Sequence, residues 1–136
     1  MAPNPPPSLP DLELAHLRSL AEQAATSTAQ LLVEGLGRRR TVVESKSTPT
    51  DLVTEMDRAA EAHLVHELLG ARPDDGFLGE EGHDTAGTSG VRWVVDPLDG
   101  TTNYLYGHPG FGVSVAAEVE GTGVVAAVAD PLHGDL

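Results

Sequence analysis

The stretch Trp93-Val-Val-Asp-Pro-Leu-Asp-Gly-Thr-Thr-Asn-Tyr104 decides how this chain folds and what it can bind. Its three apolar residues 93–95 have the composition of a buried strand. Asp96 and Asp99 follow that strand, and carboxylates at a strand end suit hard, oxygen-seeking cations such as Mg²⁺. The turn that starts at Gly100 predicts a helix whose first backbone amides suit a phosphate oxyanion. The stretch therefore predicts the parts of a metal-assisted phosphate site.

The chain as a whole is strongly acidic. Its 8 Lys and Arg residues face 21 Asp and Glu residues, which gives a formal net charge of -13. Such a charge repels anionic partners, including phosphorylated metabolites, unless a local cation inverts the field. The sequence has no basic stripe with interleaved aromatic residues, so we expect no nucleic-acid partner. The six histidines show no metal-ligand spacing.

Length and composition indicate one cytoplasmic domain. A chain of 136 residues is the size of a single domain. No apolar stretch approaches the roughly 20 residues that cross a bilayer, so we expect no membrane partner. The N-terminus lacks the basic-then-apolar pattern of a signal peptide, and we therefore expect a cytoplasmic protein. The absence of cysteine excludes disulfides, thiolate zinc sites and cysteine nucleophiles.

Upstream of the stretch, the chain begins with a proline-rich segment and a long helix. Residues 1–10 contain five prolines and predict a disordered lead-in, which leaves 11–136 as the domain. Ser8 and Asp11 stand at capping-box spacing before the helix. We expect this helix to end at Gly35 and Gly37. The apolar face of the helix comprises Leu14, Leu17, Ala21, Ala24, Thr28 and Leu31.

A strand, a loop and a second helix are expected next. Residues 41–44 have the composition of a short strand, and 45–50 that of a loop. The second helix is expected from Thr54 to Leu69, and Asp57 is at the spacing that completes a capping box with Thr54. Its core-facing residues are Leu64, Val65, Leu68 and Leu69.

The remaining segments predict a sheet. Residues 77–79 form a short strand that ends at Glu80 and Glu81, and 83–90 form a polar surface loop. Alternation over 111–119 predicts a strand, and 124–129 return as its partner. The fold class is therefore α+β, with helices packed on a largely antiparallel sheet. The last residues stop at an apparent turn, so we expect a chain truncated before a second domain.

Ordinary structural roles compete with the site. Asp-Pro and Asp-Gly are common turn dipeptides, and Glu80 with Glu81 could be a solvated acidic turn. Lys46, the only lysine, could be a solvated loop residue. One other phosphatase class is excluded, because the Asp-x-Asp-Gly-Thr pattern of haloacid-dehalogenase-type enzymes needs one residue fewer between Asp96 and Asp99.

Three elements together resemble the inositol monophosphatase family, part of a lithium-sensitive, Mg²⁺-dependent sugar-phosphatase group. They are Lys46-Ser-Thr-Pro-Thr-Asp-Leu-Val-Thr54 with Asp57, then Gly79-Glu-Glu81, then the stretch 93–104. The similarity runs from about Leu12 to the last residue. It implies a sugar-phosphatase-like α/β sandwich that hydrolyses a phosphate monoester, most readily inositol monophosphate.

The resemblance also implies roles for single residues. Glu80 and Asp96, with the carbonyl of Leu98, would bind a first Mg²⁺, and Asp96 and Asp99 would bind a second. Gly100 and Thr101 would hold the phosphate with their backbone amides. Glu80, and Thr101 paired with Asp57, would activate the attacking water. Lys46 would support the site.

The chain departs from the family pattern in one respect. The family carries a later Trp-Asp motif that completes the second metal site, and Trp93 is the only tryptophan here. We therefore expect the N-terminal half of a family member, homodimeric when full-length, and a poor phosphatase by itself. Histidinol phosphate or a nucleotide phosphate remains an alternative substrate. A non-catalytic metal- or phosphate-binding remnant is an alternative of a different class.

Overall fold

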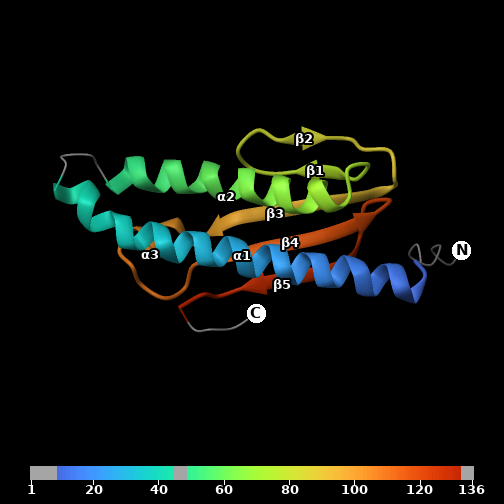
Figure 1. Ribbon diagram of the computed structural model, residues 1–136, viewed down its shortest axis with the longest axis horizontal. Coiled ribbons are helices and arrows are strands. Elements are labelled where there is room, and N and C mark those ends of the chain that lie inside the picture. The colour runs from blue at the N-terminus through green and yellow to red at the C-terminus, as the bar shows by residue number, and fades with distance from the viewer. Residues whose placement is uncertain (1–8, 45–48, 133–136) are drawn as a thin grey trace, which may run out of the picture.

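The computed structural model describes residues 9–44 and 49–132, and the side chains of residues 9–36 and 53–132. Two long helices precede a sheet that a short helix interrupts (Figure 1). The elements in chain order are α1 (Asp11–Glu44), α2 (Pro49–Ala71), β1 (Gly76–Leu78), β2 (Asp84–Thr85), β3 (Val91–Asp99), α3 (Thr101–Leu105), β4 (Gly112–Val119) and β5 (Thr122–Ala129).

The five strands form one mixed sheet in the order β2-β1-β3-β4-β5. β1 pairs with β3 in parallel, with Leu78 opposite Val94, and all the other pairs are antiparallel. The β3–β4 register shifts between Asp96 and Asp99. A bulge or irregularity therefore lies in the last part of β3, between the two acids, and bulges commonly redirect side chains.

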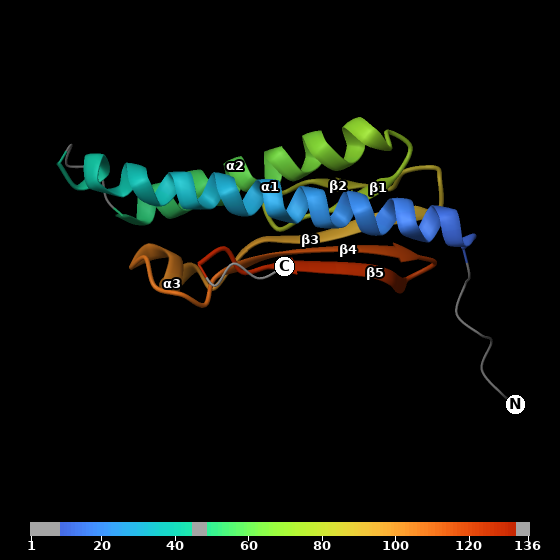
Figure 2. The same ribbon diagram turned by 60° about the horizontal axis from the view of Figure 1, so that its bottom comes forward.

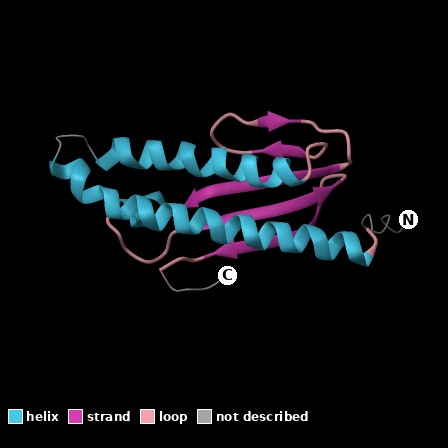
Figure 3. Ribbon diagram, viewed as in Figure 1, coloured by secondary structure: helices cyan, strands magenta, loops and turns pink. Residues whose placement is uncertain are grey.

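Both long helices cover one face of the sheet (Figures 2 and 3). α1 contacts α2, β4 and β5, and α2 contacts β3. This arrangement confirms the predicted α+β class with helices on a mostly antiparallel sheet. No helix within the described ranges is both long and apolar enough to span a bilayer.

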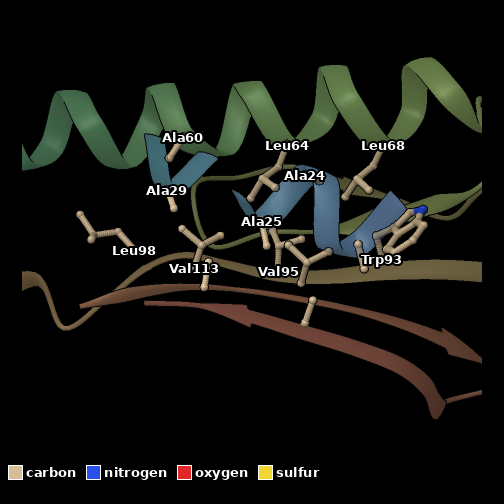
Figure 4. Packing of buried hydrophobic residues seen from close by; sticks show 14 of the residues in the cluster. Ala24, Ala25, Ala29, Ala60, Leu64, Leu68, Trp93, Val95, Leu98 and Val113 are labelled. Carbon is tan, nitrogen blue, oxygen red and sulfur yellow. The ribbon is translucent and has the colours of Figure 1, made fainter. Parts of the chain in front are cut away.

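The core lies between the helices and the sheet (Figure 4). Leu64 and Leu68 of α2 point toward β3, where Trp93 is fully buried. The core face of α1 is rich in alanine, and small side chains let a helix approach its neighbours closely. Its buried residues are Leu17, Ala21, Ala24, Ala25, Thr28, Ala29 and Leu32.

A buried acid ties the sheet together at the start of β1. Asp75 is 2% exposed. The indole Nε1–H of Trp93 donates to Asp75 Oδ2 over 2.9 Å, and Arg72 Nε donates to the same oxygen over 2.6 Å. Ser89 donates to Asp75 Oδ1 over 2.6 Å. Asp75 therefore links the end of α2 to the loop before β3.

The predicted end of the first helix is wrong. α1 runs through Gly35 to Glu44, so the expected strand at 41–44 is helical. The reason is packing: a Cβ on Gly35 would lie 2.6 Å from both Met56 Cε and the Tyr104 hydroxyl. Tyr104 also donates to the carbonyl of Leu32 over 2.8 Å. Gly35 therefore lets the side chains of Met56 and Tyr104 pack closely against the backbone of α1, and the helix continues past it.

The predicted start of the second helix is also wrong. α2 begins at Pro49, and proline suits a first helical position because its ring fixes φ and it lacks an N–H. Thr54 therefore lies inside the helix, and the proposed capping box with Asp57 does not exist. The helix also takes up residues 49 and 50 of the predicted loop, whereas 45–48 lie outside the described residues.

The sheet agrees closely with the sequence prediction. β1, β3, β4 and β5 lie where strands were expected, within two residues at each end except for β3, which extends through Asp99. The polar segment 83–90 is exposed, and only its two-residue β2 pairs, with β1. The proline-rich start and Ser8 lie outside the described residues.

Candidate metal and phosphate site

Parallel pairing places the key carboxylates at one edge of the sheet. β1 ends at Leu78 and runs beside β3, with Leu78 opposite Val94. Continuing two residues along each strand leads to Glu80 and Asp96. The carboxyl ends of neighbouring parallel strands meet at one sheet edge, a common location for ligand sites. The topology therefore brings together acids that are 16 positions apart in the sequence.

Asp96 carries a buried oxygen without a partner. Its Oδ1 accepts no hydrogen bond from any described residue. Burial and the nearby Asp99 carboxylate raise the Asp96 pKa, and a hydrogen bond from the Leu98 backbone opposes this rise. A buried oxygen left unsatisfied costs about 1–3 kcal/mol. Asp96 is thus held in an environment that favours an added positive charge.

Glu80 and Asp57 lie in the same negative field. Partial desolvation raises the Glu80 pKa although its side chain remains exposed to solvent, and repulsion from neighbouring carboxylates, that of Asp96 first, adds to the rise. Burial also raises the pKa of Asp57 to about 6, with contributions from Glu81, Glu80, Asp96 and Glu61. Carboxylates from α2, the end of β1 and the end of β3 are therefore close enough to repel one another.

The turn after β3 presents backbone amides beside these acids. Gly100 adopts φ 83° and ψ 46° before α3, and no side chain caps this end of the helix. A Cβ at Gly100 would collide with the carbonyl of Gly110. Only glycine fits there, on grounds of both backbone conformation and space. The conformation of Gly100 therefore sets where α3 begins, and the use of the first α3 amides for an anion stays a prediction.

Tyr104 fixes α3 on the rest of the fold. Its ring packs edge-on against Phe111 at 5.0 Å between centroids. Its hydroxyl donates to the Leu32 carbonyl of α1. The Asn103 amide donates to Gly110 over 3.2 Å, which closes the loop back onto β4. The turn at Gly100 and the helix α3 are thus anchored to both α1 and the segment before β4.

The donor set fits Mg²⁺ chemically. It consists of carboxylate oxygens, one of them buried and unpartnered, and Mg²⁺ prefers oxygen ligands. A divalent ion would also relieve the repulsion that raises the pKa values of Glu80 and Asp96. Within the described residues, no three acidic or histidine side chains already surround a common point. The carboxylates are neighbours whose final approach to a shared ion requires side-chain movement.

Two predicted parts of the site need separate comment. In the described part of the chain, Asp57 and Thr101 form no hydrogen bond with each other. Their pairing therefore stays a prediction. Lys46 lies outside the described residues. The assignments of Glu80, Asp96, Leu98 and Asp99 as metal ligands, and of Gly100 and Thr101 as phosphate donors, likewise remain predictions.

Sequence reasoning missed Glu61. This residue is fully buried on the core face of α2 and accepts hydrogen bonds from the segment that carries Glu80. A signal was available, because Glu61 shares a helical stripe with Asp57, Leu64 and Leu68. An acid in the apolar stripe of a helix needs a partner, which marks it for attention.

Residues 13–136 match the sequence profile of the inositol monophosphatase family. An inositol-1-monophosphatase of Rhizobium meliloti (strain 1021) is 44% identical over 121 residues, which cover 88% of this chain and 46% of that relative. A histidinol-phosphatase of Chlorobaculum parvum is 41% identical over 128 residues, with 93% of this chain and 46% of the relative covered.

A solved structure has the same fold over the same part. The extragenic suppressor protein suhB from Bartonella henselae superposes with a TM-score of 0.75 and 38% identity, covering 88% of this chain and 45% of that one. The chain thus spans about half the length of the curated relatives it matches.

Proposed function

The chain belongs to the inositol monophosphatase family, and we propose that its site hydrolyses a phosphate monoester with the help of Mg²⁺. Inositol monophosphate is the substrate we expect first, since several similar proteins are inositol-1-monophosphatases. Histidinol phosphate is the second candidate, because a relative of comparable identity is a histidinol-phosphatase. A nucleotide phosphate is a third.

One observation carries this proposal. The unpartnered Oδ1 of Asp96 lies at a sheet edge where Glu80, Asp99 and Asp57 add further negative charge. A phosphate monoester is itself anionic and would be repelled from such a place. A divalent cation held by these oxygens reverses the local field and makes the adjacent backbone amides usable for phosphate. The acids and the amide turn are therefore complementary only when a cation joins them.

Each residue then has a defined task. Glu80, Asp96, the Leu98 carbonyl and Asp99 would hold Mg²⁺, which supplies charge neutralisation and a lowered pKa for bound water. The amides of Gly100 and Thr101 would donate to phosphate oxygens. Glu80, and Thr101 with Asp57, would accept a proton from the water. The water oxygen would form the new bond to phosphorus as the bond to the alcohol oxygen breaks. The alcohol oxygen would take up a proton from solvent, and no covalent enzyme intermediate is required.

The partners follow from the same proposal. A small phosphate monoester is the ligand, and we retain the expectations of a homodimer for the longer protein and a cytoplasmic location as predictions. Because the chain spans about half of its relatives' length, we expect its own turnover to be low. Lys46 is proposed to support the site.

Phosphate release from inositol monophosphate tests the proposal. We expect slow release by the 136-residue chain that depends on Mg²⁺ and disappears in Glu80→Gln. Glu81→Gln is the matched control, since it removes the same charge one residue away and should keep most of the activity. Mg²⁺-dependent binding of inorganic phosphate, followed by thermal shift, is the second measurement. Binding without release would favour the non-catalytic remnant, and absence of both would contradict the proposal.

A further inference from the structure

Glu61 is a buried carboxylate with an unusual set of partners. It is 0% exposed. The backbone N–H of Glu81 donates to both of its oxygens, over 2.9 Å to Oε1 and 3.1 Å to Oε2. His83 Nδ1 lies 2.7 Å from Oε2. Burial favours a raised Glu61 pKa, but hydrogen bonds from Glu81, His83 and the backbone of Glu80 lower it overall. The group is therefore held as an anion by one short segment.

Gly79 shows how closely this segment fits around Glu61. A Cβ added to Gly79 would collide with Glu61 Oε1. The backbone from Gly79 to Glu81 therefore rests directly on the carboxylate. Gly79 is also fixed from its other side, because its N–H donates to the His83 carbonyl over 2.9 Å. The turn 79–83 is closed on itself and held over Glu61, and Glu80 is its second residue.

We propose that Glu61 is a positioning residue: it fixes the 79–83 turn on α2 and thereby holds the Glu80 carboxylate toward Asp96. Glu80 follows a three-residue strand and is exposed, so β1 alone gives it little support. α2 supplies that support through Glu61. This inference rests on the proposed function, since it assigns Glu61 to the binding of the same cation.

Asp75 is the natural comparison. It is also buried and accepts several hydrogen bonds, but it lies at the opposite end of β1 from Glu80. Loss of either acid should lower the stability of the fold. Only loss of Glu61 should also weaken the binding of a cation by the folded protein. Cation affinity therefore separates positioning from general structural support.

Charge needs a separate control, because Glu61 also adds to the negative field around Glu80. Gly79→Ala provides it, since this change keeps every charge and disturbs only the contact with Glu61. Gly70→Ala is its matched control, as an added Cβ in α2 at that position meets no atom within 4 Å.

The experiment is calorimetric titration of Mg²⁺ into the 136-residue chain and the four variants, with circular dichroism confirming that each is folded. We expect Glu61→Gln and Gly79→Ala each to weaken Mg²⁺ binding by about 10-fold or more, the usual effect of losing an outer-shell partner. Asp75→Asn and Gly70→Ala should match the wild type. If Glu61→Gln does not fold, Gly79→Ala decides.

The contrary results are distinct. Weakened binding in Glu61→Gln with unchanged binding in Gly79→Ala would overturn positioning and leave only a charge effect. Unchanged affinity in both would overturn the inference while leaving the proposed function intact. A wild-type chain that binds no Mg²⁺ would overturn both.

Discussion

Single residues at this site gain their properties from burial combined with like charge. Asp96, Glu80 and Asp57 all have raised pKa values, and burial is the largest cause in each case. Such groups are destabilising in a folded chain when they are ionised without a counter-ion. Functional sites commonly concentrate this kind of cost. This loss of folding stability can be measured at Asp57, which is not among the proposed metal ligands.

The pH dependence of stability should reveal Asp57. Its pKa rises from 3.8 to about 6 on folding. The folded chain therefore holds the proton more tightly than the unfolded chain, so stability falls as the pH rises from about 4 through about 6. Asp57→Asn removes this loss. We expect it to stabilise the Mg²⁺-free protein at neutral pH by less than the roughly 3 kcal/mol of the full shift, because Asp57 is only half-buried and solvent screens its charge, and to have little effect below the unfolded-state pKa.

Urea unfolding in the presence of a chelator, at neutral pH and just below pH 4, measures this difference. Equal effects of Asp57→Asn at the two pH values would contradict the assigned cause.

The acids at the end of β3 could be picked out as candidate site residues because the sequence pattern that marks them is local. Asp96, Asp99 and Gly100 closely follow the apolar residues 93–95; the strand lies where the pattern indicated but continues through Asp99, and the turn comes at Gly100. Glu61 could not be assigned its role in this way, since its partners are about 20 residues further along the chain. An acid in an apolar stripe indicates a buried partner without identifying it.

Elements differ in how far local rules determine them. Strands β3, β4 and β5 follow from alternation and turns, and the structure confirms them. The length of α1 does not follow from such rules, because a glycine can also lie inside a helix where neighbouring side chains occupy the space of its missing Cβ. At Gly35, Met56 and Tyr104 occupy the space of a side chain. The β-branched residues at 41–44 favour a strand locally, yet they continue the helix.

A double-mutant cycle tests why α1 continues past Gly35. Gly35→Ala should destabilise the fold by about 1–3 kcal/mol, as overpacking does, despite the better helix propensity of alanine. Met56→Ala removes one of the two clashes and leaves that with the Tyr104 hydroxyl, so Gly35→Ala should cost less in that background. Additive free energies of unfolding in the double variant would show that packing against Met56 is not the reason.

At the scale of the whole molecule, the helices cover one face of the sheet, and the long strand β5 forms one of its two edges. α1 and α2 lie on a single face, as Figure 2 shows. β5 is the last strand in the sheet order and, within the described residues, pairs only with β4. Val128 on this strand is 55% exposed. An unpaired, uncharged edge of this kind favours association with another strand.

Self-association should follow from this edge. We expect the 136-residue chain to form dimers or larger species as its concentration rises, and Val128→Lys to reduce them, because a charge on an edge strand opposes pairing. Sedimentation velocity over a concentration series measures both. Glu120→Gln, in the turn before β5, is the control, because it also raises the net charge by one unit. A monomeric wild type at all concentrations would contradict the expectation.

The topology of the whole sheet also brings together the two parts of the site, the Glu80 segment after β1 and the Asp96 segment of β3. The sequence predicted the elements on either side, but the parallel pairing of β1 with β3 brings Glu80 beside Asp96. That pairing depends on contacts across the sheet that no local pattern encodes. This pairing matters for function only if the acids that it brings together bind a cation.

Calorimetric titration of Mg²⁺ into wild type and Asp96→Asn tests this central claim most directly. Asp96 contributes the buried, unpartnered oxygen, so its loss should weaken binding by at least about 10-fold, the scale of losing even an indirect partner. Asp74→Asn, an exposed acid before β1, should leave the affinity unchanged. Equal Mg²⁺ affinity in wild type and Asp96→Asn would contradict the account.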